Sequence, residues 1–108
     1  MTLLQKRDAE RQQARLVLFD RTREELRTVL REVLPASRVV VYGSLTKRGV
    51  FNAASDIDLA LYEEPAEKNI FGLMAEIDGR MRRPVDIVIL SQTRLREKIL
   101  REGEVWTT

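Results

Sequence analysis

Two residue types that commonly bind metals are missing from this sequence, because its 108 residues include no cysteine and no histidine. Without cysteine there is no disulfide framework, and without either residue a zinc site is disfavoured. No apolar run approaches the length of a membrane span, and the charged first residues have no signal-peptide core. We therefore expect a protein of the reducing cytoplasm that makes no membrane contact.

An excess of one charge sign is also missing. The chain has 19 Lys and Arg against 17 Asp and Glu, a net charge of +2, and the signs alternate within every segment. Nucleic-acid binders normally gather basic residues on one face, so a polynucleotide substrate is disfavoured. The length suits a single domain with one core and leaves no room for a separate substrate-binding domain.

A chemically distinctive segment lies between residues 39 and 61. An apolar strand there leads into Gly43 and Ser44, and a second strand begins with Asp56 and includes Asp58. Residues two apart on a strand face the same side, so these two carboxylates converge and repel unless a cation lies between them. Asp86 lies in a third, very apolar strand, where a lone charge is costly. This combination predicts a site for Mg²⁺ and a nucleoside triphosphate.

In these positions the chain resembles the minimal nucleotidyltransferases of the DNA polymerase β superfamily. Gly43 and Ser44 follow the first strand, Asp56 and Asp58 form an Asp-x-Asp pair on the second, and Asp86 is the acidic residue of the third. The core resemblance covers about residues 39–90. Eleven residues separate Ser44 from Asp56, one more than is usual in similar antitoxin proteins, and we place the extra residue in a loop, where insertions cost little.

The resemblance and phosphoryl-transfer chemistry together imply roles for these residues. Asp56 and Asp58 hold Mg²⁺, and Asp86 completes the metal site and orients or deprotonates the attacking hydroxyl. Ser44 and nearby backbone amides bind the β- and γ-phosphates of ATP. Lys47 and Arg48 either neutralise the departing phosphates or simply form a solvated helix face.

The segments around these motifs predict a nucleotidyltransferase-like α/β (α+β) fold, a mixed three-stranded sheet backed by helices. Strands at 39–42 and 56–62 are expected to be antiparallel neighbours, and a strand at 84–90 is expected to run parallel to the second. A helix at 65–81, with Pro65 in its first turn, supplies the crossover.

The ends of the chain complete the expected single domain, residues 1–108. Residues 1–34 are its long N-terminal helix, with a polar projecting start, and 39–90 are the catalytic core. A short helix at 44–48 follows the first strand. Residues 91–108 are a C-terminal helix capped by Thr93, and a tail. Trp106 in that tail either folds onto the core or anchors an interface.

The end of the chain, residues 99–106, also resembles the tail of proteins paired with HEPN partners. The resemblance implies an antitoxin that transfers AMP from ATP to a tyrosine of a HEPN ribonuclease toxin. One alternative is a standalone enzyme acting on a small hydroxylated molecule such as an aminoglycoside, through a second domain or a homodimeric cleft. The other is a catalytically silent, binding-only antitoxin. Oligomeric state stays open.

Overall fold

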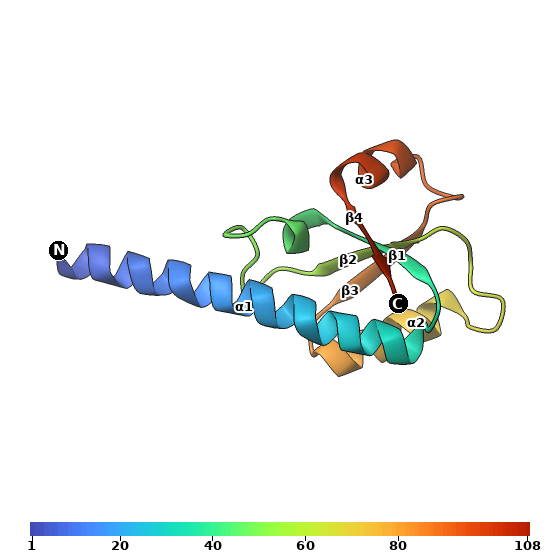
Figure 1. The fold of residues 1–108 in the computed structure, drawn as a ribbon, viewed down its shortest axis with the longest axis horizontal. Helices are drawn as coiled ribbons and strands as arrows, with labels where there is room; N and C mark the ends of the chain where they lie inside the picture. The colour runs from blue at the N-terminus through green and yellow to red at the C-terminus, as the bar shows by residue number, and fades with distance from the viewer.

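The computed structural model describes residues 1–108, and it combines one long helix with a small mixed sheet (Figure 1). In chain order the elements are α1 (Leu3–Val33), β1 (Arg38–Tyr42), the 3₁₀ helix η1 (Gly43–Thr46), β2 (Ile57–Leu61), α2 (Ile70–Met81), β3 (Val85–Ile89), α3 (Arg96–Glu102) and β4 (Glu104–Thr107). The expected fold class is therefore confirmed.

The sheet has four strands in the order β3-β2-β1-β4. β1 pairs antiparallel with β2, and β2 pairs parallel with β3, as the sequence predicts. The predicted crossover between the parallel strands is made by α2. The fourth strand was not predicted: β4 adds antiparallel to the free edge of β1. The tail therefore belongs to the sheet, and the expectation of three strands is corrected.

Each face of the sheet has its own apolar layer. α1 and α2 cover one face, where Val39, Val41, Ile57 and Leu59 join the main core. α3 lies on the opposite face, where Ile99 packs with Val40, Ala60 and Leu90 in a smaller cluster (Figure 1). The alternation along β1 and β2 distributes successive side chains to these two layers.

The N-terminal part of α1 extends beyond the sheet (Figure 1). Thr2 caps the helix in a capping box with Gln5, and residues 1–15 are all exposed. The first buried residue on this helix is Phe19, so the predicted polar projection is confirmed. No helix in the structure is both long enough and apolar enough to cross a membrane.

Two helix starts differ from expectation. α2 begins at Ile70, five residues after Pro65, because Asn69 is its N-cap and accepts from the amides of Phe71 and Gly72. α3 begins at Arg96 rather than after Thr93, whose hydroxyl accepts from the Leu95 amide in a local turn. Short polar side chains such as those of Asn69 and Thr93 can accept from backbone amides either at a helix N-cap or in a local turn. The sequence pattern alone therefore does not fix the residue at which each helix begins.

Trp106 folds onto the core and is only 5% exposed. It lies in β4 opposite Val39, so its side chain faces α1, and the guanidinium groups of Arg23 and Arg27 lie 5.1 and 4.0 Å from its ring. The alternative reading of Trp106 as an exposed interface anchor is therefore wrong. Its indole nitrogen is buried and makes no hydrogen bond of normal geometry, although the indole, after Arg23, helps to lower the pKa of the Glu104 carboxyl.

Candidate active site

Tyr42, Asp58 and Asp86 form one row across the three strands β1, β2 and β3. Tyr42 is the register partner of Asp58, and Asp58 is the register partner of Asp86. Directly paired residues project to the same face of a sheet, so the phenol and the two carboxylates share the α3 side. The next row on this face consists of Val40, Ala60 and Val88, over which α3 packs. The polar row thus lies at the edge of this apolar patch.

Asp56 immediately precedes β2, two residues before Asp58. Asp56 and Asp86 are exposed, whereas Asp58 is partly buried between the neighbouring strands. The expectation that Asp86 would be a costly buried charge in an apolar strand is therefore wrong. β3 is an edge strand, and Asp86 lies near the start of it, at the margin of the apolar cluster under α3.

The electrostatics of the row disfavour additional negative charge. Burial raises the pKa of the Asp58 carboxyl, and the negative charges of Asp86 and Asp56 raise it further. Burial, and after it the negative charges of Asp58 and Asp86, raises the pKa of the Tyr42 phenol to about 12. The phenol is consequently neutral at physiological pH, and a cation is the ligand that would relieve the repulsion among the carboxylates.

The donor set fits Mg²⁺ bound together with a nucleotide. No group of three or more acidic side chains in the structure closes around a single metal position. Mg²⁺ does not require one, because it is usually held by one or two carboxylates together with substrate phosphates and water. Asp58 and Asp86 supply hard oxygen donors on adjacent strands, and Asp56 supplies a third nearby.

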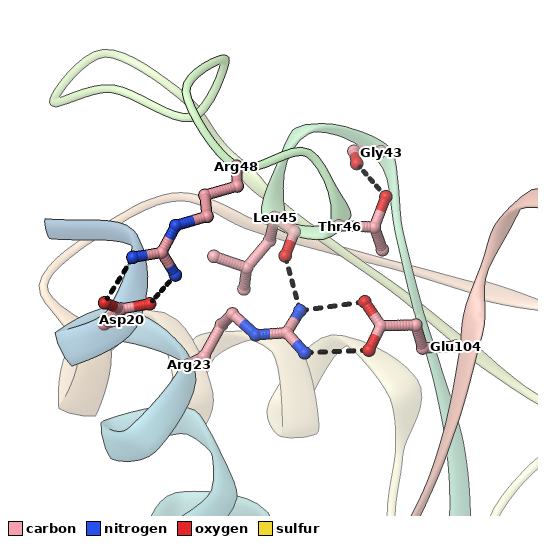
Figure 2. Close-up of polar contacts among 7 residues, drawn as sticks. All are labelled: Asp20, Arg23, Gly43, Leu45, Thr46, Arg48 and Glu104. Carbon is pink, nitrogen blue, oxygen red and sulfur yellow. Dashed lines mark hydrogen bonds and ion pairs between the residues drawn. The ribbon is translucent and has the colours of Figure 1, made fainter. Parts of the chain in front are cut away.

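The Gly43–Thr46 turn follows β1 directly and approaches Asp58 closely. Gly43 has a φ of +73°, and a Cβ built there would lie 2.4 Å from Asp58 Oδ2. The Thr46 hydroxyl donates to the Gly43 carbonyl at 2.7 Å, and Leu45 is fully buried beneath the turn (Figure 2). The predicted helix at 44–48 is thus a four-residue 3₁₀ turn, too short for a substantial helix dipole.

The two basic residues after the turn do not contact the carboxylate row. Lys47 is exposed. Arg48 donates from both terminal nitrogens to Asp20 of α1, at 2.7 and 3.2 Å, and both side chains are exposed (Figure 2). The structure brings Gly43 together with Asp58 and Asp86. No contact in the structure supports the predicted phosphate role of Lys47 and Arg48.

A residue that the sequence interpretation missed, Arg83, holds the loop that leads to Asp56. Its Nη1 donates to the carbonyls of Asn52 at 3.1 Å and Ala53 at 3.2 Å, and also to that of Ser55. Its guanidinium lies 4.7 Å from the ring centroid of the buried Phe51. Because these acceptors are backbone carbonyls, no side-chain pattern could have indicated the contact.

The carboxylates lie on an open surface. None of the five main grooves of the protein is lined by Asp56, Asp58 or Asp86. A groove of about 590 Å³ lies elsewhere, between α1 and the end of α2. None of these five grooves therefore offers the carboxylates an enclosed pocket for a small ligand.

Comparisons with known proteins agree with this geometry. The family described as "Polymerase beta, Nucleotidyltransferase" matches residues 24–107. A solved structure, "Crystal structure of the toxin-antitoxin with AMP-PNP", is similar with a TM-score of 0.61 and 24% sequence identity, over 79% of this chain and 73% of that chain. No curated protein sequence matches the chain. The family match spans most of the chain and every residue of the carboxylate row, so the chain belongs to the polymerase β nucleotidyltransferase family.

Proposed function

We propose that this protein is a Mg²⁺-dependent nucleotidyltransferase that acts as a cytoplasmic antitoxin, transferring AMP from ATP to a tyrosine of a HEPN ribonuclease toxin and thereby neutralising it. The observation that carries the proposal is the register pairing of Asp58 with Asp86, next to the close approach of Gly43 to Asp58. Two acidic strand residues beside a glycine turn are the arrangement that metal-assisted transfer from a triphosphate needs.

Each residue has a defined task in the proposed reaction. Ser44 and the first amides of its turn bind the β- and γ-phosphates, and Asp56 and Asp58 are the Mg²⁺ ligands. Bound Mg²⁺ would neutralise the charge that develops on the phosphate oxygens. Asp86 orients the acceptor hydroxyl and accepts its proton. The acceptor oxygen forms a bond to the α-phosphorus while the bond to the bridging α–β oxygen breaks, and pyrophosphate leaves.

The open site supports a macromolecular acceptor. None of the main grooves is lined by the carboxylates, so a small acceptor placed at them would have few protein atoms to hold it. A tyrosine on a partner protein would instead be positioned by the partner's own interface. The exposed residues 1–15 of α1 offer surface for such a contact. The similar structure, a toxin–antitoxin with AMP-PNP, supports both the kind of partner and the adenine nucleotide.

The test is the intact mass of the partner. Purified protein, Mg²⁺ and ATP, incubated with the HEPN protein encoded next to it, should give a partner heavier by one or more AMP units on tyrosine. Asp56→Asn should abolish this gain and leave the complex intact. Asp78→Asn, which removes an exposed carboxylate from α2, is the matched control and should transfer normally.

Two results would replace the proposal. A partner that binds tightly and stays unmodified with each of the four nucleotides would identify a binding-only antitoxin. No partner binding, together with modification of an added aminoglycoside, would identify a standalone small-molecule transferase.

A further inference from the structure

Arg23 of α1 connects three parts of the structure that are distant in sequence. Its Nη1 donates to the Leu45 carbonyl at 2.7 Å and to Glu104 Oε2 at 2.9 Å, and its Nη2 donates to Glu104 Oε1 at 2.7 Å (Figure 2). Leu45 belongs to the Gly43–Thr46 turn, and Glu104 opens β4. One guanidinium therefore joins the helix, the turn and the added strand.

The surroundings of Arg23 fix its orientation. Its guanidinium lies 5.1 Å from the ring centroids of both Phe19 and Trp106, and its side chain is only 18% exposed. Glu104 faces α1 because it is the register partner of Val41, which lies on that side of the sheet. The hydrogen bonds from Arg23 lower the pKa of the Glu104 carboxyl, so the ion pair persists at neutral pH. The bidentate ion pair with Glu104 leaves Arg23 little rotamer freedom, so its guanidinium can hold one further acceptor, the Leu45 carbonyl, in a fixed position.

The Leu45 carbonyl belongs to the turn that would bind the phosphates of the nucleotide. Leu45 directly follows Ser44, and its fully buried side chain already anchors the turn on the side facing α1. Arg23 adds a charged donor to the Leu45 carbonyl, so the peptide between Leu45 and Thr46 is held from both sides. The adjoining amides are thereby fixed before any phosphate arrives, which lowers the ordering cost of binding.

We propose that Arg23, restrained by Glu104, is a positioning residue for the triphosphate: it orders the Gly43–Thr46 turn for nucleotide binding. This inference rests on the proposed function for the identity of the ligand. Arg23 itself touches neither Asp58 nor Asp86, so it acts through the turn. Arg23 lies one residue before the segment matched by the family, residues 24–107.

The experiment compares Arg23→Met with Arg80→Met. Arg80 also makes an ion pair with α1, through Glu32, but it lies in α2 and does not contact the turn. Two quantities are measured without any toxin: amide hydrogen exchange of residues 43–47 in the nucleotide-free protein, and the Kd of Mg²⁺–ATP. Arg23→Met should speed exchange of the turn and weaken ATP binding roughly tenfold, because a buried carbonyl loses its charged donor. Arg80→Met should change neither.

Two further variants separate positioning from general stability. Arg23→Lys retains the charge but cannot hold both partners with one planar group, so it should restore binding only in part. Glu104→Gln leaves Arg23 in place and weakens its restraint, so it should shift exchange and Kd in the same direction by a smaller factor. In the transfer assay Arg23→Met should raise the KM for ATP and leave kcat within about threefold of wild type.

The outcomes distinguish this inference from the proposed function. If the wild-type protein binds Mg²⁺–ATP and Arg23→Met binds it equally well with unchanged exchange, Arg23 does not position the turn, and the proposed function stands. If the wild-type protein binds no Mg²⁺–ATP, the proposed function fails and the nucleotide role of Arg23 fails with it. Faster exchange of the turn in Arg23→Met would then still show that Arg23 orders it.

Discussion

Gly43 and Asp58 approach each other so closely that no side chain can stand between them. A Cβ on Gly43 would lie 2.4 Å from Asp58 Oδ2, and the φ of +73° is one that other residues adopt with strain. The turn that would hold phosphates and the carboxylate that would hold Mg²⁺ are thus in van der Waals contact. Glycine at this position allows the anionic ligand and the cation to be bound as neighbours.

Gly43→Ala should therefore impair both folding and the site. The positive φ alone costs about 1–2 kcal/mol, and the clash must in addition displace Asp58. Gly49→Ala is the matched control, because its φ is +88° and its nearest contact is the flexible end of Gln12 at 3.1 Å. Urea denaturation should show a loss for both variants, whereas the Kd of Mg²⁺–ATP should rise only in Gly43→Ala. Equal Kd values in both would show that the contact with Asp58 is not functional.

Asp58→Asn should stabilise the metal-free protein at neutral pH. The pKa of Asp58 is raised in the folded state, so folding favours its protonated form, and its contribution to stability falls as pH rises from the unfolded value toward the folded one. At pH 7 the wild type carries the full penalty, and asparagine removes it. Thermal melting at pH 7 without Mg²⁺ should give a higher Tm for Asp58→Asn, and the difference should shrink in acid.

Adding ligand should reverse that order. Mg²⁺–ATP at about a hundred times its Kd should stabilise the wild type by roughly 2.7 kcal/mol, while Asp58→Asn should gain far less. Asp78→Asn is the control and should follow the wild type in both conditions. A metal-free Asp58→Asn protein that melts below wild type would mean that the carboxylate is structural.

The sequence was sufficient to predict the strands that carry strong apolar runs. β1, β2 and β3 lie within a residue or two of their predicted bounds, and requiring the acidic residues to converge gave their relative directions correctly. β4 was missed because its four residues, Glu104–Thr107, include only two apolar ones and follow a helix without a hairpin turn. Such a strand is stabilised by pairing with β1, which a local pattern does not report.

The candidate site was predictable where it depended on spacing and not where it depended on tertiary contacts. Strand periodicity put Asp56 and Asp58 on one side of the second strand, and requiring the acidic residues to converge put Asp86 beside them; the structure pairs Asp58 with Asp86. The environment of Asp86 was misjudged, since an apolar strand at the edge of a sheet still exposes one face near its end. Arg23 and Arg83 were missed because each binds backbone carbonyls far away in sequence. Their roles are visible only once the chain is folded.

Trp106 should matter for its volume rather than for its indole nitrogen. The side chain is 5% exposed and fills the space between β4 and α1, so Trp106→Ala should cost about 3–5 kcal/mol. Trp106→Phe should cost far less, because the ring volume is largely kept and the buried N–H makes no hydrogen bond of normal geometry that would be lost. Urea denaturation of both variants measures the difference. Similar losses for phenylalanine and alanine would contradict this account.

Arg83 should affect both the free energy of unfolding and AMP transfer, because it holds the loop of residues 52–55 that leads to Asp56. Removing its guanidinium in Arg83→Met leaves the carbonyls of Ala53 and Ser55 without their side-chain donor and Phe51 without its stacked partner, whereas the Asn52 carbonyl keeps its bond from the Ser55 amide. We expect a loss of about 2–3 kcal/mol in the free energy of unfolding, since hydrogen bonds to a charged donor are among the stronger ones. The loop ends at Asp56, so AMP transfer by the molecules that remain folded should also slow.

The control for Arg83 is Arg96→Met, which removes an exposed arginine from the start of α3. It should leave both stability and transfer near wild type. Arg83→Lys should recover part of the stability, because an ammonium group can donate to some of the same carbonyls but cannot stack as a plane on Phe51. If Arg83→Met is destabilised and its folded fraction still transfers AMP at the wild-type rate, the position of Asp56 does not depend on the loop. The segment between Lys47 and Asp56 would then serve the site only as a connection between two strands.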